Sequence, residues 1–124
     1  MSESETNLYQ PIITALAESR LACVWRNQAG SVRAKGGWIH MAPEGTPDLI
    51  GFVLYGPRKG AFVGLEVKAK RGRETTLQAT WRTRIVSAGG IAAVVYSPQE
   101  AVTLLRRELT PELEGIGMIP GPAR

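Results

Sequence analysis

Two apolar segments separated by a short turn constrain the fold of this chain most strongly. Residues 48–55 and residues 61–68 are rich in β-branched and aromatic side chains, and residues 56–60, which include glycine and proline, stand between them. Apolar runs of this length, bounded by turn residues, predict two strands that pair as a β-hairpin. The middle of the chain should therefore form an antiparallel strand pair.

Periodic patterns on both sides of this hairpin predict the other elements. Apolar residues at helical spacing indicate a helix over residues 5–20, in which Pro11 should delay the start or bend the axis. The remaining expected elements are a strand over residues 22–26, a helix from Thr75 or Thr76 to Gly89, a strand over residues 91–96 and a helix over residues 97–109. Residues 110–124 are rich in glycine and proline and should be irregular.

The order of these elements predicts an α/β domain. Helix, strand, hairpin, helix, strand and helix favour a mixed central sheet of about four strands flanked by helices. The 124 residues fit one domain that spans residues 1–124. The glycine-rich residues 27–46 are expected to form a long, partly mobile loop near the substrate, although residues 37–41 could extend into a strand.

Charge, cysteine content and hydropathy limit the kinds of binding partner and the cell compartment that we expect for this chain. The formal net charge is +4. Residues 68–84 contain several Lys and Arg residues and a single acidic residue, Glu74. This distribution suits a polyanionic partner, with a plain solvated face as the alternative.

The single cysteine, Cys23, cannot form an internal disulfide and is expected to be buried. No apolar run approaches the ~20 residues that span a bilayer, and the acidic N-terminus is unlike a signal peptide, so a cytoplasmic location is expected.

The end of the second hairpin strand carries charges that packing does not explain. Side chains alternate along a strand, so Glu66 and Lys68 point to one face and Val67 to the other. An exposed cross-strand ion pair is the ordinary interpretation of such charges. Asp48, the only aspartate of the chain, follows Pro47 at the head of the partner strand. The ordinary interpretation of that residue is an aspartate that closes a turn.

Two carboxylates at neighbouring strand ends repel each other unless a cation lies between them. Hard divalent ions such as Mg²⁺ take oxygen ligands of this kind and retain waters. A metal held by Asp48 and Glu66 can acidify a bound water and neutralise charge that develops on a phosphoryl group. Lys68 can orient or deprotonate that water or pair with the phosphate, and its pKa decides between these roles. The three residues therefore predict phosphodiester hydrolysis.

These residues resemble a known family, the VRR-NUC (virus-type replication-repair nuclease) family of the PD-(D/E)xK nuclease superfamily. The matching stretches are residues 25–27, residues 45–51, residues 64–68, Gln78 and Gly89-Gly90, in the order and spacing of the family. The resemblance implies a restriction-endonuclease-like αβββαβ core within one PD-(D/E)xK nuclease domain. It also implies an endonuclease that hydrolyses DNA phosphodiester bonds with Mg²⁺ or Mn²⁺.

The resemblance also implies roles for individual residues. The residues that match the catalytic motif and the glutamine of the following helix are Asp48, Glu66, Lys68 and Gln78. Glu5 matches an acidic residue of the first helix that adds a carboxylate to the metal site, although Glu3 is close to the same position. Small stand-alone members, mostly from phages, look like homodimers that cut branched DNA such as four-way junctions. A phage-encoded member would act in the host cell cytoplasm, and the preferred DNA structure of this chain stays open.

Several further residues have both a functional and an ordinary interpretation. The candidates for DNA contacts, each with a solvated surface position as the alternative, are Arg26, Arg33, Lys35, Lys70, Arg71 and Arg73. Leu77, Trp81 and Ile85 form an apolar stripe that should face the core, and His40 should lie on the surface. The alternative functions are a non-catalytic nucleic-acid-binding module with the same fold and a structural phage protein that binds no DNA.

Overall fold

The computed structural model describes residues 3–110, and the expected irregular tail lies outside them except for Thr110. Its helices are α1 (Glu3–Glu18), α2 (Thr76–Ser87) and α3 (Pro98–Leu109). Its strands are β1 (Ala22–Arg26), β2 (Ser31–Ala34), β3 (Gly37–His40), β4 (Leu49–Val53), β5 (Phe62–Val67) and β6 (Ile91–Val95). Among these helices, none is long and apolar enough to cross a membrane.

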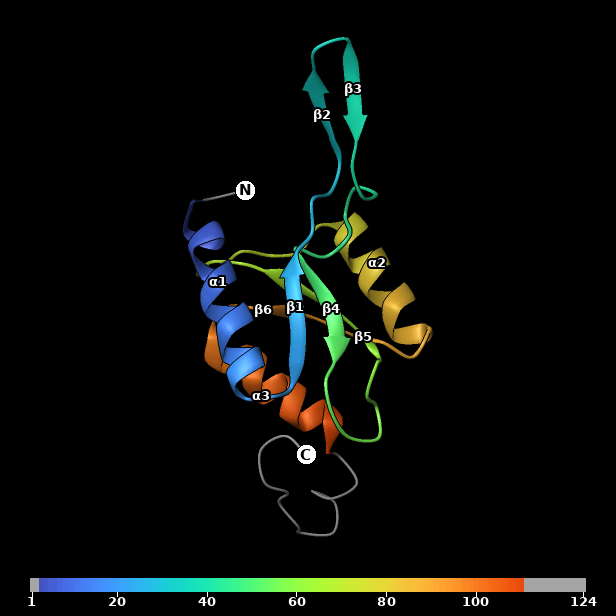
Figure 1. Cartoon of the computed structure of the whole chain (residues 1–124). Coiled ribbons are helices and arrows are strands. Elements are labelled where there is room, and N and C mark those ends of the chain that lie inside the picture. Colours follow the sequence, from blue (N-terminus) through green and yellow to red (C-terminus); the bar gives the residue numbers. More distant parts are fainter. Residues whose placement is uncertain (1–2, 111–124) are drawn as a thin grey trace.

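The main sheet is mixed and has four strands in the order β1-β4-β5-β6. The pairs β1–β4 and β4–β5 are antiparallel, and β5–β6 is parallel. Helices α1 and α3 cover one face of the sheet and α2 lies on the other (Figure 1). The α/β class and the sheet of four strands flanked by helices, expected from the order of elements, are confirmed.

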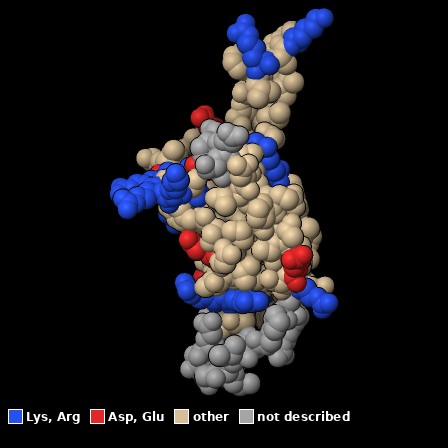
Figure 2. All heavy atoms as spheres, turned by 90° about the vertical axis from the view of Figure 1, so that its left-hand side faces the viewer, with Lys and Arg blue, Asp and Glu red and all other residues tan. Residues whose placement is uncertain are grey.

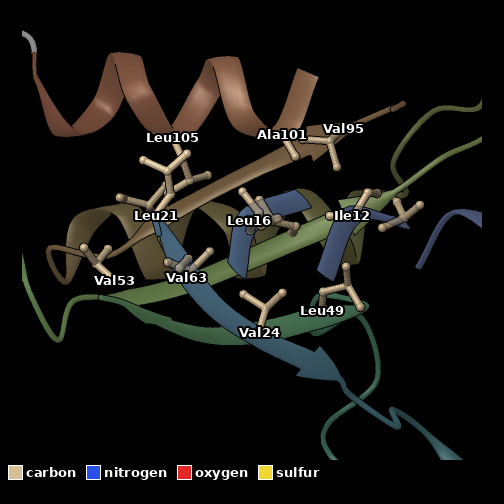
Figure 3. Packing of buried hydrophobic residues seen from close by; sticks show 14 of the residues in the cluster. Ile12, Leu16, Leu21, Val24, Leu49, Val53, Val63, Val95, Ala101 and Leu105 are labelled. Atoms are coloured by element: carbon tan, nitrogen blue, oxygen red, sulfur yellow. The ribbon is translucent and has the colours of Figure 1, made fainter. Parts of the chain in front are cut away.

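The core lies between the sheet and the pair α1 and α3. Ile12 and Leu16 of α1 and Leu105 of α3 are fully buried there against side chains of the strands (Figure 3). Full burial of one such side chain contributes about 1.5–3 kcal/mol. Of the two effects expected of Pro11, a late start or a bend, the late start is not found, because α1 begins at Glu3 and contains Pro11 in its interior. Pro11 is exposed, and the buried face of the helix offsets the main-chain hydrogen bond that proline cannot donate.

Residues 28–42, here called the arm, form an ordered β-hairpin instead of the long loop expected from their glycine content. In the arm, β2 pairs with β3 in an antiparallel two-stranded sheet of its own. The turn between them is Lys35-Gly36, and Gly36 and the first residue of β3, Gly37, have φ angles of 87° and 143°, values that side chains rarely allow. The glycines that suggested a loop therefore close a hairpin, and the arm projects away from the body of the molecule (Figure 1).

The sheet face that carries α2 is only partly covered, and two expectations about burial are wrong for that reason. Ala22 and Val24 take the buried positions of β1, so Cys23 between them points to the open face and is exposed. No residue of α2 is buried. Trp81, expected in the core, is half-buried and its indole N–H donates to the carbonyl of Glu44 at 3.2 Å. The apolar stripe of α2 therefore lies partly on the segment before β4, at Glu44 and Gly45, and partly on β5 at Gly64, and it adds no buried residue to the core.

Candidate active site

Asp48 stands where the antiparallel ladder between β4 and β5 ends. Leu49 pairs with Leu65 in this ladder, and Pro47 has no N–H with which to continue it. Oδ2 of Asp48 instead accepts a hydrogen bond of 2.8 Å from the main-chain N–H of Val67. The proline and the aspartate together end the ladder and fix the Asp48 carboxylate against β5.

Glu66 is a charged residue that the fold buries, with 2% of its surface exposed. Leu65 and Val67, its neighbours on β5, belong to the core under α1 and α3, so Glu66 points to the other face of the sheet. The pKa of the Glu66 carboxyl is raised to about 8, mainly by burial and in addition by the charge of the nearby Asp48 carboxylate and its hydrogen-bonding contact. The charge of Lys68 acts in the opposite direction.

The two carboxyl groups need either a shared proton or a cation. Oε2 of Glu66 is buried and has no hydrogen-bond donor, and an uncompensated buried oxygen costs about 1–3 kcal/mol, or more when charged. A proton held between Asp48 and Glu66 supplies the missing donor, which is the state that the raised pKa of Glu66 favours. A hard divalent cation would compensate the same oxygens without the proton. The oxygen ligands of this carboxyl pair therefore fit such a cation.

Gln78 connects the first turn of α2 to Glu66. Its Nε2 atom donates to Oε1 of Glu66 at 3.2 Å. Its Oε1 atom accepts the main-chain N–H of Thr75 at 2.8 Å, and its own N–H donates to the Thr75 hydroxyl at 3.1 Å. These two bonds form a reciprocal capping box at the start of the helix. The same cap that begins α2 thus orients the amide of Gln78 toward the buried carboxylate.

Tyr9 of α1 reaches Asp48 from the other side of the sheet end. The phenol is 4% exposed. Burial and the charge of Asp48, together with a hydrogen bond to that side chain, raise its pKa. The guanidinium of Arg26 lies 5.2 Å from the centre of the Tyr9 ring and lowers the same pKa. The sequence patterns did not single out Tyr9, because its place on α1 is that of an ordinary core residue.

Lys68 follows β5, and its main-chain N–H donates to the carbonyl of Val95 at 3.0 Å, which extends the parallel ladder by one residue. The side chain is half-buried. The chain then turns at Lys70, whose φ is 51°, and the Tyr96 hydroxyl donates to the carbonyl of Gly72 at 2.7 Å. The exposed basic side chains of this segment are Lys70, Arg71 and Arg73. Three of the candidate DNA contacts therefore lie on one short segment beside the two carboxylates.

Glu74 has a partner of its own. Its carboxylate accepts hydrogen bonds from Nε and Nη2 of Arg82, at 3.1 Å and 2.6 Å to Oε1. Its charge raises the pKa of Glu66 less than burial and Asp48 do. Arg82 therefore neutralises Glu74. Asp48 and Glu66 lie close to each other, and within residues 3–110 the structure shows no ion pair of this kind for either of them.

Two glycines let the strands and α2 pack closely beside the two carboxylates. A Cβ at Gly51 would clash with the main chain of β1 at the carbonyl of Cys23. A Cβ at Gly64 would lie 2.7 Å from Cγ of Pro47 and 3.1 Å from Cδ1 of Ile85. Gly64 therefore allows the ring of Pro47 and helix α2 to pack on β5. Gly51 and Gly64, which lie near Asp48 and Glu66 in the sequence, are thus explained by close packing that a side chain would prevent.

The structure brings four of the predicted residues together and leaves others apart. Asp48, Glu66 and Gln78 are joined by the contacts described above, and Lys68 is close enough to influence Glu66. Glu5 lies near Tyr9, whose pKa its charge raises, and its role as a metal ligand stays a prediction. Within the described residues, no group of three or more His, Cys, Asp or Glu side chains is arranged to hold a metal ion. Arg33 and Lys35 lie on the arm, away from the carboxylates.

Comparison of the sequence with models of known protein families and with curated proteins gave no match.

Proposed function

We propose that this chain is a metal-dependent endonuclease that hydrolyses DNA phosphodiester bonds at Asp48, Glu66 and Lys68. The observation that carries the proposal is the buried Glu66 carboxylate, which faces Asp48 and has one oxygen without a donor. A buried carboxylate pair destabilises a fold unless a counterion or a proton compensates it, and such costly groups cluster at functional sites. In metal-dependent hydrolysis of a phosphodiester, the counterion of the two carboxylates would be the divalent cation that the reaction needs.

Each residue has a role that its surroundings support. Asp48 and Glu66 would hold Mg²⁺ or Mn²⁺, with waters and a substrate phosphate as the other ligands. When bound, such an ion neutralises charge on the phosphoryl group and activates water. Gln78 orients Glu66 through its amide. Lys68, which is half-buried at the strand end, would bind the scissile phosphate or move a proton of the attacking water.

The order of elements around the site supports the family resemblance. When the arm strands β2 and β3 are set aside, the remaining elements run in the order α1, β1, β4, β5, α2 and β6, which is the αβββαβ order of a restriction-endonuclease-like core. The exposed basic segment of Lys70, Arg71 and Arg73 lies next to the carboxylates, where a phosphate backbone would pass. The resemblance extends the proposal to branched DNA such as four-way junctions.

A homodimer is part of the proposal because a four-way junction offers two equivalent cleavage positions. The open sheet face supports it. Trp25, Phe52 and Phe62 are exposed there, and the rings of Trp25 and Phe52 meet edge to face with centres 6.3 Å apart. Apolar clusters of this kind on a surface mark interfaces. A second copy of the chain would cover them.

A non-catalytic nucleic-acid-binding module with the same fold is the alternative. The buried Glu66 speaks against it, because a carboxylate beside the phosphate path weakens binding. Such a module would bind DNA but would not cut it with any divalent ion.

The experiment that tests the proposal is cleavage of linear, flapped and four-way-junction DNA with Mg²⁺ or Mn²⁺. EDTA, Asp48→Asn and Lys68→Ala should each abolish cutting. Lys59→Ala serves as a matched control, because Lys59 is an exposed residue in the turn at the opposite end of β4 and β5. Cleavage that survives both site substitutions would overturn the proposal.

A further inference from the structure

The arm exposes large apolar side chains that the fold does not need. Trp38 is 59% exposed, and Val32 and Ile39 are also exposed. The arm stands clear of the three-layer body (Figures 1 and 2), so these side chains have no core to join. Exposed apolar groups on an ordered projection indicate contact with a partner.

The register of the arm gives it two distinct faces. Directly opposed residues of antiparallel strands share a face, and Arg33 pairs with Trp38 while Ser31 pairs with His40. On this face the Arg33 guanidinium lies 5.8 Å from the centre of the Trp38 ring. The Ser31 hydroxyl and Nδ1 of His40 are 3.0 Å apart. One face of the arm therefore carries a cation on an aromatic ring beside two groups that can exchange hydrogen bonds.

The charge of the arm favours a polyanion as its partner. Residues 28–42 include Arg33, Lys35 and His40 and contain no Asp or Glu. Figure 2 shows Lys and Arg side chains at the tip of the arm. The arm of a second copy would bring the same positive charges to the contact and be repelled. A phosphate backbone instead releases its counterions to such residues.

The dimensions of the arm fit a groove of duplex DNA. A two-stranded β-ribbon enters a major groove about 12 Å wide. At about 3.3 Å per residue, strands of the length of β2 and β3 span about 13 Å. Their arginine and tryptophan face can then contact phosphates and base edges along roughly four base pairs, at about 3.4 Å each.

The base of the arm is hydrogen-bonded to residues 46–48, which lead into β4. The main-chain N–H of Asn27 donates to the carbonyl of Asp48 at 2.8 Å. The Asn27 side chain donates to the Thr46 hydroxyl and to the carbonyl of Pro47, each at 2.9 Å. The segments that enter and leave the arm are thus joined next to the Asp48 carboxylate. A duplex in contact with the arm would continue past the site.

From these observations we infer that the arm is a duplex-DNA contact that lies in a groove beside the cleaved bond, with Arg33 and Trp38 toward the DNA. This inference rests on the proposed function for its choice of nucleic acid. It adds a requirement that the two carboxylates do not impose: a stretch of intact duplex on the arm side of the scissile phosphate.

The test measures binding separately from cleavage. Fluorescence anisotropy with a labelled 30-base-pair duplex, flanking a four-way junction or alone, is recorded with Ca²⁺ in the Asp48→Asn background, where no cutting is expected. Arg33→Ala and Trp38→Ala should each weaken binding about tenfold, and Arg33→Ala should reduce the salt dependence by about one phosphate contact. Lys59→Ala, which also removes one exposed basic residue, should bind within about twofold of the parent.

The outcomes separate this inference from the proposed function. Reduced binding of the two arm variants supports the arm contact even when the wild type cuts no DNA tested. Unchanged binding of both arm variants overturns it even when the wild type is an active nuclease. Weaker binding that coincides with dissociation of a dimer in analytical ultracentrifugation assigns the arm to a second copy and also overturns it. The arm side chains lie outside the core, so both variants should keep the melting temperature of the parent.

Discussion

The side-chain amide of Gln78 donates a hydrogen bond of 3.2 Å to Oε1 of Glu66, and the other oxygen of that carboxylate has no donor. One oxygen is therefore held by the protein, and the other is buried without a hydrogen-bond partner. A carboxylate held in this way has lost much of its rotational freedom before any ligand arrives. This is the arrangement by which an outer residue orients a metal ligand.

Removal of the Gln78 amide should slow cleavage more than it destabilises the fold. Gln78→Ala is expected to reduce the cleavage rate about 10- to 100-fold, the range seen when a partner of a metal-binding side chain is lost. It also removes half of the capping box, with a loss of about 1 kcal/mol in unfolding free energy. Cleavage kinetics and urea unfolding measure the two effects.

Thr75→Ala is the matched control for Gln78→Ala. It removes the hydroxyl of the same capping box and leaves the contact between Gln78 and Glu66 in place. The expected loss of unfolding free energy is again about 1 kcal/mol, with cleavage close to that of the wild type. Equal loss of activity in both variants would show that Gln78 acts only by starting α2.

Loss of the Tyr9 hydroxyl should affect Asp48. Tyr9→Phe keeps the buried ring and removes the hydrogen bond to the carboxylate. We expect unfolding free energy to fall by about 1 kcal/mol and the cleavage rate constant to fall with little change in KM. Tyr55→Phe, a change at an exposed tyrosine beyond the end of β4, should leave both quantities unchanged. A wild-type rate constant in Tyr9→Phe would remove Tyr9 from the site.

The stability of the metal-free protein should fall as pH rises from about 4.5 to 8. The Glu66 pKa is raised from 4.5 to about 8 in the folded state, so the folded protein keeps a proton that the unfolded chain loses. The favourable contribution is complete below pH 4.5 and is lost through the folded pKa. The loss is at most about 1.4 kcal/mol per pH unit. Urea unfolding at several pH values measures it.

Glu66→Gln should flatten this pH dependence, since glutamine keeps the shape of a protonated glutamate and does not titrate. The variant is expected to match the wild type near pH 5 and to exceed it in stability near pH 8. Parallel profiles for the two proteins would contradict the assignment of the transition to Glu66.

The sequence predicts the sheet and the contact between Asp48 and Glu66 because both depend on local rules. The hairpin of β4 and β5 brings strand ends together, and alternation along β5 places Glu66 on the face away from the core. The arm was missed because the glycines of a hairpin turn have the same composition as a loop. Tyr9 and the exposed Cys23 depend on which face each helix covers, and that is set by packing among distant elements.

The most direct measurement of the central claim is the melting temperature of the metal-free protein with and without millimolar Mn²⁺ or Mg²⁺. A ligand that binds only the folded state stabilises it, so the wild type should melt at a higher temperature with the ion. Asp48→Asn and Glu66→Gln should each lose that rise, and both should be at least as stable as the wild type without metal at neutral pH, because each removes one of the two acids that must share a proton in the metal-free protein. An equal rise in the wild type and in both variants would place the ion elsewhere and contradict a shared site at Asp48 and Glu66.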